Sequence, residues 1–240
     1  NELFFYGAGL RDEMKDKVMP TLQHVFPTAT IEAQSDLIAA ARALCRHDEG
    51  IACILGTGAN SCLYDGSRII SNVPPMGYIL GDEGSGAVIG KTFLNALYKG
   101  KHQDFIPTFE SETGLTLPAI TECVYRKPMP NRFLASLAPF IKAHISETWI
   151  NDLVTDCFRL FFQHNVRHYL TPPQPQLQPS QREEDGATAQ ADSSLFTLNS
   201  SLSVSFVGSI AYHFQNQLRE AAKAEGLTIA KIMKEPLQQE

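Results

Sequence analysis

Glycine and acidic residues gather between residues 51 and 92, in a pattern that suits the binding of an anion. An unbroken apolar run, residues 51–55, leads directly into Gly56-Thr57-Gly58. Further along, a second stretch surrounds Asp82 and Glu83 with four glycines, Gly77, Gly81, Gly84 and Gly86. Glycines spaced in this way let backbone N–H groups approach a ligand closely, and an anion is the natural ligand of such groups. The two stretches together predict a phosphate site that faces a carboxylate.

The elements that must position these residues are those of an α/β protein. Residues 51–55 are typical of a strand buried on both faces, and Asp65-Gly66 predicts a hairpin turn after a short strand at 61–64. Residues 51–74 are therefore expected to form antiparallel strands. The second glycine-rich stretch should lead into a helix at about 84–99.

Strands and helices alternate before this region. A strand at 3–6, a helix at 11–25 and a strand at 28–33 are followed by a helix that Ser35-Asp36 opens. An alternation of this kind predicts a parallel sheet with covering helices.

Helices dominate beyond residue 99, and strands return near the end of the chain. Helices are expected at 117–125, 131–145 and 147–170, strands at 203–207 and 229–233, and a helix between these strands after Gly208-Ser209. Residues 171–195 are rich in Pro, Gln and small polar residues. They cannot bury much apolar area, so we expect them to form a mobile insertion.

Composition and charge argue against several classes of protein. The 240-residue chain has a formal net charge of −6 and no run of Lys or Arg, which argues against a nucleic-acid or acidic-membrane partner. No apolar stretch approaches the ~20 residues that a membrane span needs. The five cysteines are odd in number and scattered, which favours reduced thiols in the cytoplasm.

The motifs carry a family resemblance. GTGANS, GYILGDEGSGAVIG and the later VSFVGSIAYHF resemble the N-acetylglucosamine kinase family, which also includes the ATPases that activate benzoyl-CoA reductase. That family belongs to the actin/hexokinase/Hsp70 superfamily. The resemblance covers most of the chain and is weakest between about 100 and 200. It implies a two-lobed, ribonuclease H-like α/β fold (the actin-like ATPase fold), with ATP and Mg²⁺ in the cleft between Thr57 and Gly208.

The resemblance also implies how the chain divides. The family opens with a strand and an Asp-Gly-Gly-Gly-Thr-like turn that cradles phosphate, and nothing of that kind precedes Asn1. We therefore expect the chain to be a piece of a longer protein, with the first lobe truncated at its N-terminus. Residues 1–47 would be the remainder of the first lobe. Residues 48–240 would be the second lobe, with a helical insert.

The resemblance assigns Asp36 as the catalytic aspartate, which would accept or orient the proton of the acceptor hydroxyl. Asp36 also stands where a predicted strand ends and a helix begins, a place where α/β sheets present ligand-binding groups. The alternative is that Asp36 or Ser35 simply caps the helix.

Five further residues would bind the nucleotide. Gly56, Thr57 and Gly58 would cradle the transferring phosphoryl group by hydrogen bonds. Gly208 and Ser209, at a second strand-to-helix turn, match the positions at which the family contacts adenosine, and such a turn suits an anion or adenosine. An ordinary structural turn is the alternative at both places.

On the acceptor side, Asn60, Gly77 and Asp82 match sugar-binding positions of the family. The family often has a Gly-Trp pair before the glycine that matches Gly77, and this chain has Pro75-Met76 there. Glu83 could reach Mg²⁺ through water, but a place in the first turn of the helix, where acids suit the dipole, is favoured.

Two other patterns are set aside. Residues 85–92 nearly match a P-loop but lack its first glycine and lie within a helical pattern. His164 and His168 are spaced to share a helix face but have no third ligand nearby in the sequence. We assign no metal-binding residue.

The implied activity is ATP-dependent phosphorylation of an amino sugar, N-acetylglucosamine to its 6-phosphate, by a protein that the family implies to be a homodimer. One alternative is a nucleotide-hydrolysing activator of a reductase or dehydratase, with an iron–sulfur cluster between two subunits. Cys123 and Cys157 are the only plausible cluster ligands. Another is a non-catalytic sugar or nucleotide sensor, suggested by the missing phosphate turn and the absent Gly-Trp pair.

Overall fold

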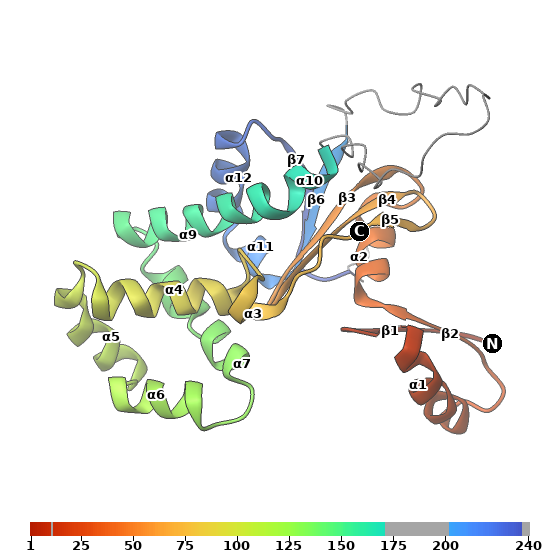
Figure 1. Cartoon of the computed structure of the whole chain (residues 1–240), viewed down its shortest axis with the longest axis horizontal. Coiled ribbons are helices and arrows are strands. Elements are labelled where there is room, and N and C mark those ends of the chain that lie inside the picture. The colour runs from red at the N-terminus through yellow and green to blue at the C-terminus, as the bar shows by residue number, and fades with distance from the viewer. Residues whose placement is uncertain (11, 171–201, 237–240) are drawn as a thin grey trace, which may run out of the picture.

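The computed structural model describes residues 1–10, 12–170 and 202–236 of the chain (Figure 1). They form two sheets covered by helices, one with two strands and one with five, in the order β5-β4-β3-β6-β7. The prediction of an α/β protein is therefore confirmed. The predicted insertion at 171–195 lies outside the described residues.

The smaller sheet pairs β1 (Glu2–Gly7) with β2 (Thr30–Ser35) in parallel, from Glu2 opposite Thr30 to Gly7 opposite Ser35. Helix α1 (Asp12–Val25) joins the two strands, as the alternation of elements predicts. The second strand starts two residues later than the predicted 28–33, because residues 26–29 form a turn, in which the Ala29 N–H donates to Phe26 O at 3.2 Å.

The larger sheet joins an antiparallel meander to two parallel strands. The meander is β3 (Glu49–Leu55), β4 (Ala59–Asp65) and β5 (Ile69–Ser71). Strands β6 (Ser203–Val207) and β7 (Ile229–Met233) lie parallel to β3, with the predicted bounds. The turn after β4 spans residues 66–68, because the Asp65 carboxylate accepts hydrogen bonds from the backbone N–H groups of both Ser67 and Arg68.

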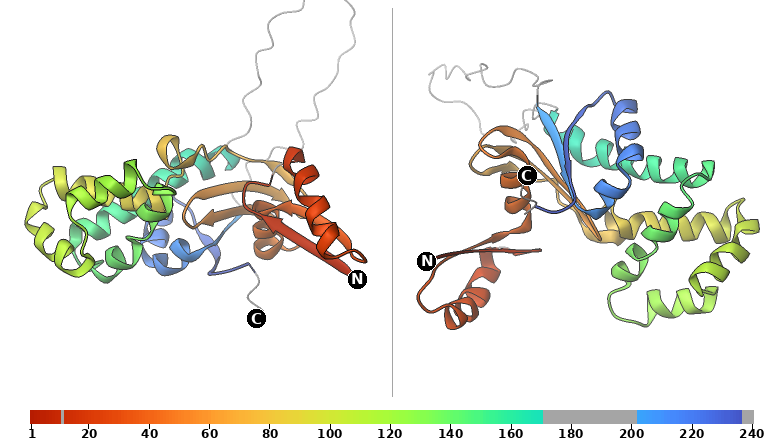
Figure 2. Two further views of the ribbon diagram at one scale, coloured as in Figure 1. Left: turned by 90° about the horizontal axis from the view of Figure 1, so that it is seen from below. Right: turned by 180° about the vertical axis from the view of Figure 1, so that it is seen from behind.

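Helix α2 (Asp36–Cys45) follows the smaller sheet in sequence but packs on the larger one. Its apolar side chains form one core with residues of β3, β4, β6 and β7; the helix contributes Leu37, Ala40, Ala41, Leu44 and Cys45. Both figures of the ribbon show α2 between the two sheets (Figures 1 and 2). Arg42 of α2 donates to Tyr6 Oη at 2.8 Å and to Glu32 Oε1 at 3.0 Å, which ties the helix to both strands of the smaller sheet.

The opposite face of the larger sheet is covered by helices around an aromatic core that includes Phe93, Phe158 and Phe206. The helices on this face are α9 (Thr148–Phe161), α10 (Arg167–Leu170), α11 (Ser209–His213) and α12 (Gln215–Ala224), with the π-helix η2 (Phe162–Val166). The other helices lie at and beyond one end of the sheet (Figure 1): α3 (Gly77–Leu80), α4 (Gly86–Lys99), α5 (Ile106–Thr113), α6 (Leu117–Tyr125), α7 (Pro130–Ala135) and α8 (Ala138–Ala143), with a 3-10 helix η1 (Gln103–Phe105). None of the helices in the described part of the chain combines the length and apolar character of a membrane span.

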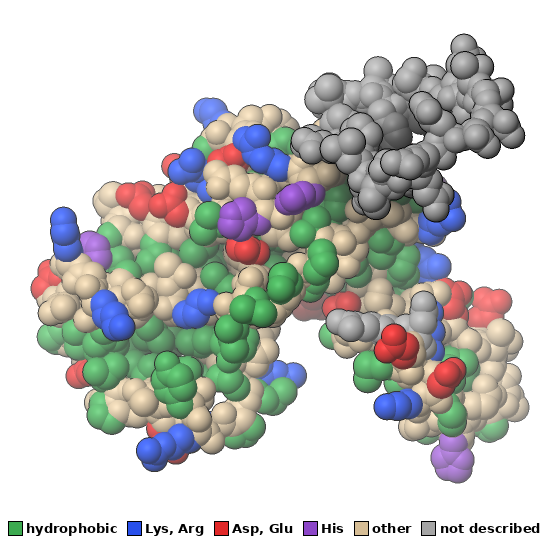
Figure 3. All heavy atoms as spheres, viewed as in Figure 1, with side chains coloured by type: hydrophobic (Ala, Val, Ile, Leu, Met, Phe, Trp, Pro, Cys, Tyr) green, Lys and Arg blue, Asp and Glu red, His purple; other side chains and the backbone are tan. Residues whose placement is uncertain are grey.

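Three of the predicted helices are interrupted. The single helix predicted after Gly208-Ser209 divides into α11 and α12 at Phe214. The helix predicted at 131–145 divides into α7 and α8, because Pro139 has no N–H to continue the first helix and suits the start of the second. The helix predicted at 147–170 is interrupted by η2. Helix α5 was not predicted. Figure 3 shows the molecule deeply hollowed between this helical part and the part that carries β1, β2 and α1.

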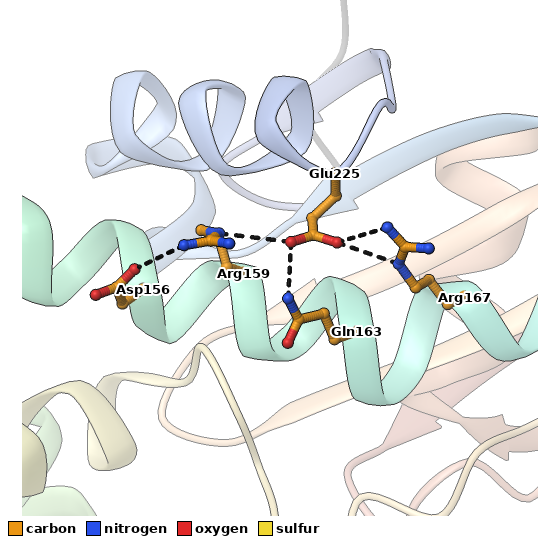
Figure 4. A network of polar contacts seen from close by, with 5 residues as sticks. All are labelled: Asp156, Arg159, Gln163, Arg167 and Glu225. Atoms are coloured by element: carbon orange, nitrogen blue, oxygen red, sulfur yellow. Dashed lines mark hydrogen bonds and ion pairs between the residues drawn. The ribbon is translucent and has the colours of Figure 1, made fainter.

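Glu225 joins the end of α12 to the α9–η2–α10 segment (Figure 4). Its carboxylate accepts hydrogen bonds from Arg167 Nη2 at 2.7 Å and Gln163 Nε2 at 2.8 Å, and forms an ion pair with Arg159. The Glu225 side chain is only 5% exposed because the arginines cover it, whereas the arginines themselves are 54% and 44% exposed. Solvent around the exposed arginines therefore weakens the electrostatic attraction between these arginines and Glu225.

Replacing Glu225 with Gln should lower the free energy of unfolding at pH 7 by about 1–2 kcal/mol. Hydrogen bonds from Arg167 and Gln163 hold the pKa of this carboxyl below its ordinary value. The stabilisation is therefore complete above the ordinary carboxyl pKa and is lost as the pH falls through the lower folded-state pKa. Urea unfolding of both proteins from pH 7 to about 3 should show the two stabilities converging in acid; a constant difference would contradict this origin.

Candidate active site

The Gly56-Thr57-Gly58 segment is the tip of the hairpin between β3 and β4. The Gly56 N–H donates to the Gly58 carbonyl oxygen at 2.9 Å, which closes the turn, and Leu55 pairs with Ala59 below it. Thr57 is exposed at the tip. The residues predicted to cradle phosphate therefore stand together at one end of the larger sheet.

The start of α4 is fastened to this turn. The Gly86 N–H donates to Gly56 O at 2.8 Å, and the Ala87 N–H donates to Thr57 O at 3.1 Å. A Cβ on Gly86 would lie 3.1 Å from both Ala135 Cβ and Ile210 Cδ1, so glycine permits this close approach. The structure thus brings the two glycine-rich motifs together, but these two N–H groups hold the turn and are not directed at a ligand.

A cavity of about 910 Å³ opens beside the turn. Gly56 and Thr57 line it together with Ser209, the first residue of α11. The chain thus brings two of the predicted phosphate residues and one predicted adenosine residue into one cavity, although they are far apart in sequence. Gly58 and Gly208 are not among its lining residues.

The remaining walls of this cavity come from residues that the sequence did not indicate. Helices α7 and α8 contribute Arg132, Ser136 and Lys142, and α11 contributes His213. Isolated basic residues on helices form no motif, and α7 and α8 fall in the stretch where the family resemblance is weakest. Their position opposite the glycine turn depends on packing alone.

Gly208 lies directly behind this cavity and requires glycine. Its φ of 126° is accessible to few residues other than glycine, and a Cβ there would collide with the backbone carbonyl of Leu55. Its N–H donates to Met233 O at 3.0 Å. The turn after β6 is thereby held against the ends of β3 and β7.

Asp36 lines a second cavity, of about 610 Å³, together with Gly208, Arg42 and Lys234. It is the first residue of α2, and Ser35 is the N-cap, whose hydroxyl accepts from the Ile38 N–H at 3.4 Å. The cap of α2 is therefore Ser35 and not Asp36. Burial raises the pKa of this carboxyl above its ordinary value, although backbone N–H groups, including that of Gly9, donate to it and oppose the shift.

Asp82 faces the glycine turn. A Cβ on Gly58 would lie 3.1 Å from Asp82 Oδ2, and the carboxylate accepts a hydrogen bond from the Ala59 backbone. Burial raises the pKa of Asp82 above its ordinary value. Asp82 adopts a left-handed conformation, with φ of 55°, which is uncommon for a residue other than glycine.

The two other predicted sugar-side residues differ in their surroundings. Asn60 Oδ1 accepts hydrogen bonds from the Ser61 N–H and from Asn72 Nδ2, both at 2.9 Å, so its oxygen already has two donors. Gly77 is exposed, has φ of 75°, and has open space where a side chain would be. Neither is among the residues that line the two cavities.

The prediction that Glu83 lies in the first turn of a helix is wrong. Helix α4 begins at Gly86 and has no acidic residue in its first turn. Glu83 Oε1 instead lies 3.0 Å from His164 Nδ1, and Oε2 accepts from Asn165 Nδ2 at 3.4 Å. Burial acts to raise the pKa of Glu83, but these hydrogen bonds hold it below its ordinary value.

The described residues include no group of three or more His, Cys, Asp or Glu side chains arranged to hold a metal ion. Residues 85–92 lie within or next to α4 and form no P-loop. His164 lies within the π-helix, where the i, i+4 spacing no longer places two residues on one face, and it pairs with Glu83.

Comparisons with known proteins agree with the sequence resemblance. No protein-family model matches the chain, and no curated protein matches it. The solved structure of a protein named putative N-acetylglucosamine kinase, from Porphyromonas gingivalis, is similar over 98% of this chain and 74% of its own, with 39% identity and a TM-score of 0.82.

A second solved structure, also named putative N-acetylglucosamine kinase, comes from Chromobacterium violaceum. It is similar over 95% of this chain and 70% of its own, with a TM-score of 0.63. At 16% identity this similarity bears on the fold alone. The Porphyromonas gingivalis protein, in contrast, is 39% identical to this chain over 98% of the chain's length. The chain therefore belongs to the N-acetylglucosamine kinase family.

Proposed function

We propose that this protein is an ATP-dependent kinase that transfers a phosphoryl group to an amino sugar, and that the reaction converts N-acetylglucosamine to its 6-phosphate. The observation that carries the proposal is the cavity shared by Gly56, Thr57 and Ser209. Both motifs that were assigned to nucleotide binding, the glycine turn at 56–58 and the turn at 208–209, therefore contribute residues to the same cavity, although they are far apart in the sequence. The similarity to the Porphyromonas gingivalis protein supports the same activity.

The cavity suits ATP in size and chemistry. Its volume of about 910 Å³ lies within the range of small-molecule sites. Arg132 and Lys142 supply positive charge opposite the exposed glycine turn, which would favour phosphate groups. Apolar side chains that could pack against a base complete the lining, namely Ala138, Pro139, Ile210 and Phe214.

Mg²⁺ would enter with the nucleotide and neutralise charge on its phosphates. This ion keeps several waters and binds through one or two carboxylates plus substrate phosphates, so a dedicated protein cluster is not required. We assign no residue of this chain as its ligand.

Asp36 would act on the acceptor hydroxyl as the catalytic base, and Asp82 would bind the sugar. A carboxylate is sufficient for this work because phosphoryl transfer depends mainly on positioning and electrostatics. We further propose that the two sheets belong to two lobes of an actin-like ATPase fold, with α2 packed on the second lobe, and that the lobes close around the substrates. A homodimer and a cytoplasmic location remain predictions.

The cysteines favour the kinase over the activator alternative. Cys157 belongs to the core, where it is 4% exposed, and burial raises the pKa of its thiol to about 11. An iron–sulfur cluster between two subunits requires thiolates at a surface. Cys123 is only partly buried, but Cys157 cannot join it at an interface without unpacking the core.

The test is ATP consumption by the full-length protein, coupled to ADP detection, with N-acetylglucosamine, glucosamine, N-acetylmannosamine and glucose as acceptors. We expect turnover with an amino sugar, and a sugar 6-phosphate as the product. ATP hydrolysis without any sugar dependence would favour the activator reading. Saturable binding of sugar or ATP with no turnover would favour a sensor.

A further inference from the structure

One helical segment is hydrogen-bonded to both ends of the loop that carries the predicted acceptor residues. This loop, residues 73–83, is called the acceptor loop below; it leads from β5 towards α4 and contains Gly77 and Asp82. The helical segment consists of α9, η2 and α10, which follow one another without a break. The two parts are close in space but far apart in sequence.

The first attachment is made by Tyr169 of α10. Its hydroxyl accepts a hydrogen bond from the Val73 N–H at 2.8 Å and donates to the Ser61 carbonyl at 2.9 Å. It also lies 2.9 Å from Ser61 Oγ. Tyr169 is 8% exposed, so a phenylalanine there would leave the Val73 N–H without this partner in a largely buried place, whereas the Ser61 carbonyl would keep a hydrogen bond from Asn72 Nδ2 at 2.6 Å.

The second attachment is made by His164 and Asn165 of η2, which hold the two carboxylate oxygens of Glu83. Asn165 is buried at 5% exposure, whereas the His164 side chain is 55% exposed. Gly84, which follows Glu83 in the sequence, has φ of 72°, and a Cβ on it would lie 3.2 Å from atoms of both Phe158 and Phe161 of α9. The end of the acceptor loop thus lies directly against the helical segment.

The π-helix η2 makes these two attachments compatible. A π-turn inserts one residue into a helix, which rotates all later residues by about 100° relative to an uninterrupted α-helix. His164 and Asn165 lie inside η2, and Tyr169 lies beyond it. The side of the helix from which Tyr169 reaches Val73 therefore depends on the π-turn.

Between its attachments, the acceptor loop is closed by its own backbone. The Asp82 N–H donates to Pro75 O at 2.9 Å, and the Gly81 N–H donates to Gly77 O at 2.7 Å. Lys91 of α4 adds one contact, from Nζ to Tyr78 O at 2.7 Å.

Three apolar side chains in the middle of the loop contribute little to holding it. Met76, Ile79 and Leu80 are between 62% and 72% exposed, and Figure 3 shows hydrophobic side chains gathered at the surface over α3. Val73 and Tyr78 pack partly against the core, so hydrogen bonds at the two ends of the loop add to these contacts in fixing its conformation.

We propose that Tyr169, His164 and Asn165 are positioning residues, which act from η2 and α10 to hold the acceptor loop so that the Asp82 carboxylate stays against Gly58. The inference rests on the proposed function in one respect, since Asp82 is taken to bind the acceptor. None of the three residues needs to touch a substrate. Their effect on the loop exists in the free protein as well.

Hydrogen–deuterium exchange of the free protein tests the attachments without any assumption about activity. In Tyr169→Phe and in His164→Ala, backbone amides of residues 72–84 should exchange about tenfold faster, while the rest of the larger sheet keeps its protection. His164→Ala serves as the second variant because the exposed side chain should be removable without unfolding. Tyr98→Phe is the matched control, because its hydroxyl bonds to Glu110 at 3.4 Å near the other end of α4.

Kinetics test the consequence for the acceptor. Both variants should raise the KM for the amino sugar about fivefold to tenfold and leave the KM for ATP within about twofold, whereas Tyr98→Phe should change neither. Unchanged exchange over residues 72–84 in both variants would overturn the proposal, as would an equal increase in exchange throughout the protein. If the unaltered protein phosphorylates no amino sugar, the proposed function fails, and the exchange result still decides whether the attachments hold the loop.

Discussion

Replacing Asp36 with Asn is expected to lower kcat by about 10²–10⁴-fold, because the acceptor hydroxyl loses the carboxylate that takes or orients its proton. The KM for ATP should change little, since Asp36 lines the cavity beside the nucleotide cavity and not that cavity itself. Asn has the same size and can still accept a backbone N–H bond at the start of α2. Stability should therefore stay within about 1 kcal/mol.

Ser35→Ala is the matched control for this experiment. Ser35 caps the same helix through the Ile38 N–H, so its loss should cost about 0.5–2 kcal/mol of stability with little effect on kcat. The two variants thus separate the chemical role from the cap. An Asp36→Asn protein that retains more than about a tenth of the original kcat would show that the base lies elsewhere.

The pH dependence of kcat/KM provides a second test of Asp36 as the catalytic base. The base works in its ionised form, and burial raises the pKa of this carboxyl. Activity should therefore fall as the pH drops through a value above the ordinary aspartate pKa of about 3.9. Asp36→Asn should remove this acid limb from whatever activity remains.

Replacing Gly208 with Ala should abolish ATP binding and destabilise the protein by about 3 kcal/mol or more. The φ of 126° is strained for any residue with a Cβ, and that Cβ would meet the Leu55 carbonyl. Leu55 precedes the glycine turn and Ser209 follows Gly208, so any shift that relieves the collision moves two walls of the nucleotide cavity apart. Urea unfolding and nucleotide titration measure the two effects.

Gly226→Ala is the matched control for Gly208→Ala. Gly226 also has a positive φ, of 74°, but no atom lies within 4 Å of where its Cβ would be. This change should cost only about 1 kcal/mol and leave ATP binding intact. Equal losses in the two variants would mean that backbone strain, and not the collision with Leu55, determines the effect at Gly208.

Local rules of the chain predicted much of the fold. Strand 229–233 and helix 117–125 have the predicted bounds, because apolar periodicity and neighbouring turn residues determine such elements within a few positions. The same rules did not predict structural features that depend on contacts between residues far apart in the sequence. Helix 147–170 shows a continuous helical pattern, yet η2 interrupts it where His164 and Asn165 meet Glu83.

Some residues of the candidate site could also be predicted from local sequence, whereas others could not. Gly56, Thr57 and Ser209 were assigned to the site from motifs that carry the family resemblance, since the turns in which they lie can be recognised in a few consecutive residues. Arg132 and Lys142 could not be predicted, because nothing near them in sequence marks them as binding residues. They line the cavity proposed for the nucleotide only because α7 and α8 pack beside α4.

The sequence by itself determined the strands, most of the turns and helices, and which glycines and carboxylates they carry, because these depend mainly on neighbouring residues. Only the tertiary structure decided which segments meet. Helix α2 follows the smaller sheet but buries its apolar face on the larger one, which brings Asp36 to the junction of both. A helix's periodicity specifies that it has an apolar face, whereas the surface that covers this face is chosen by the packing of the whole chain.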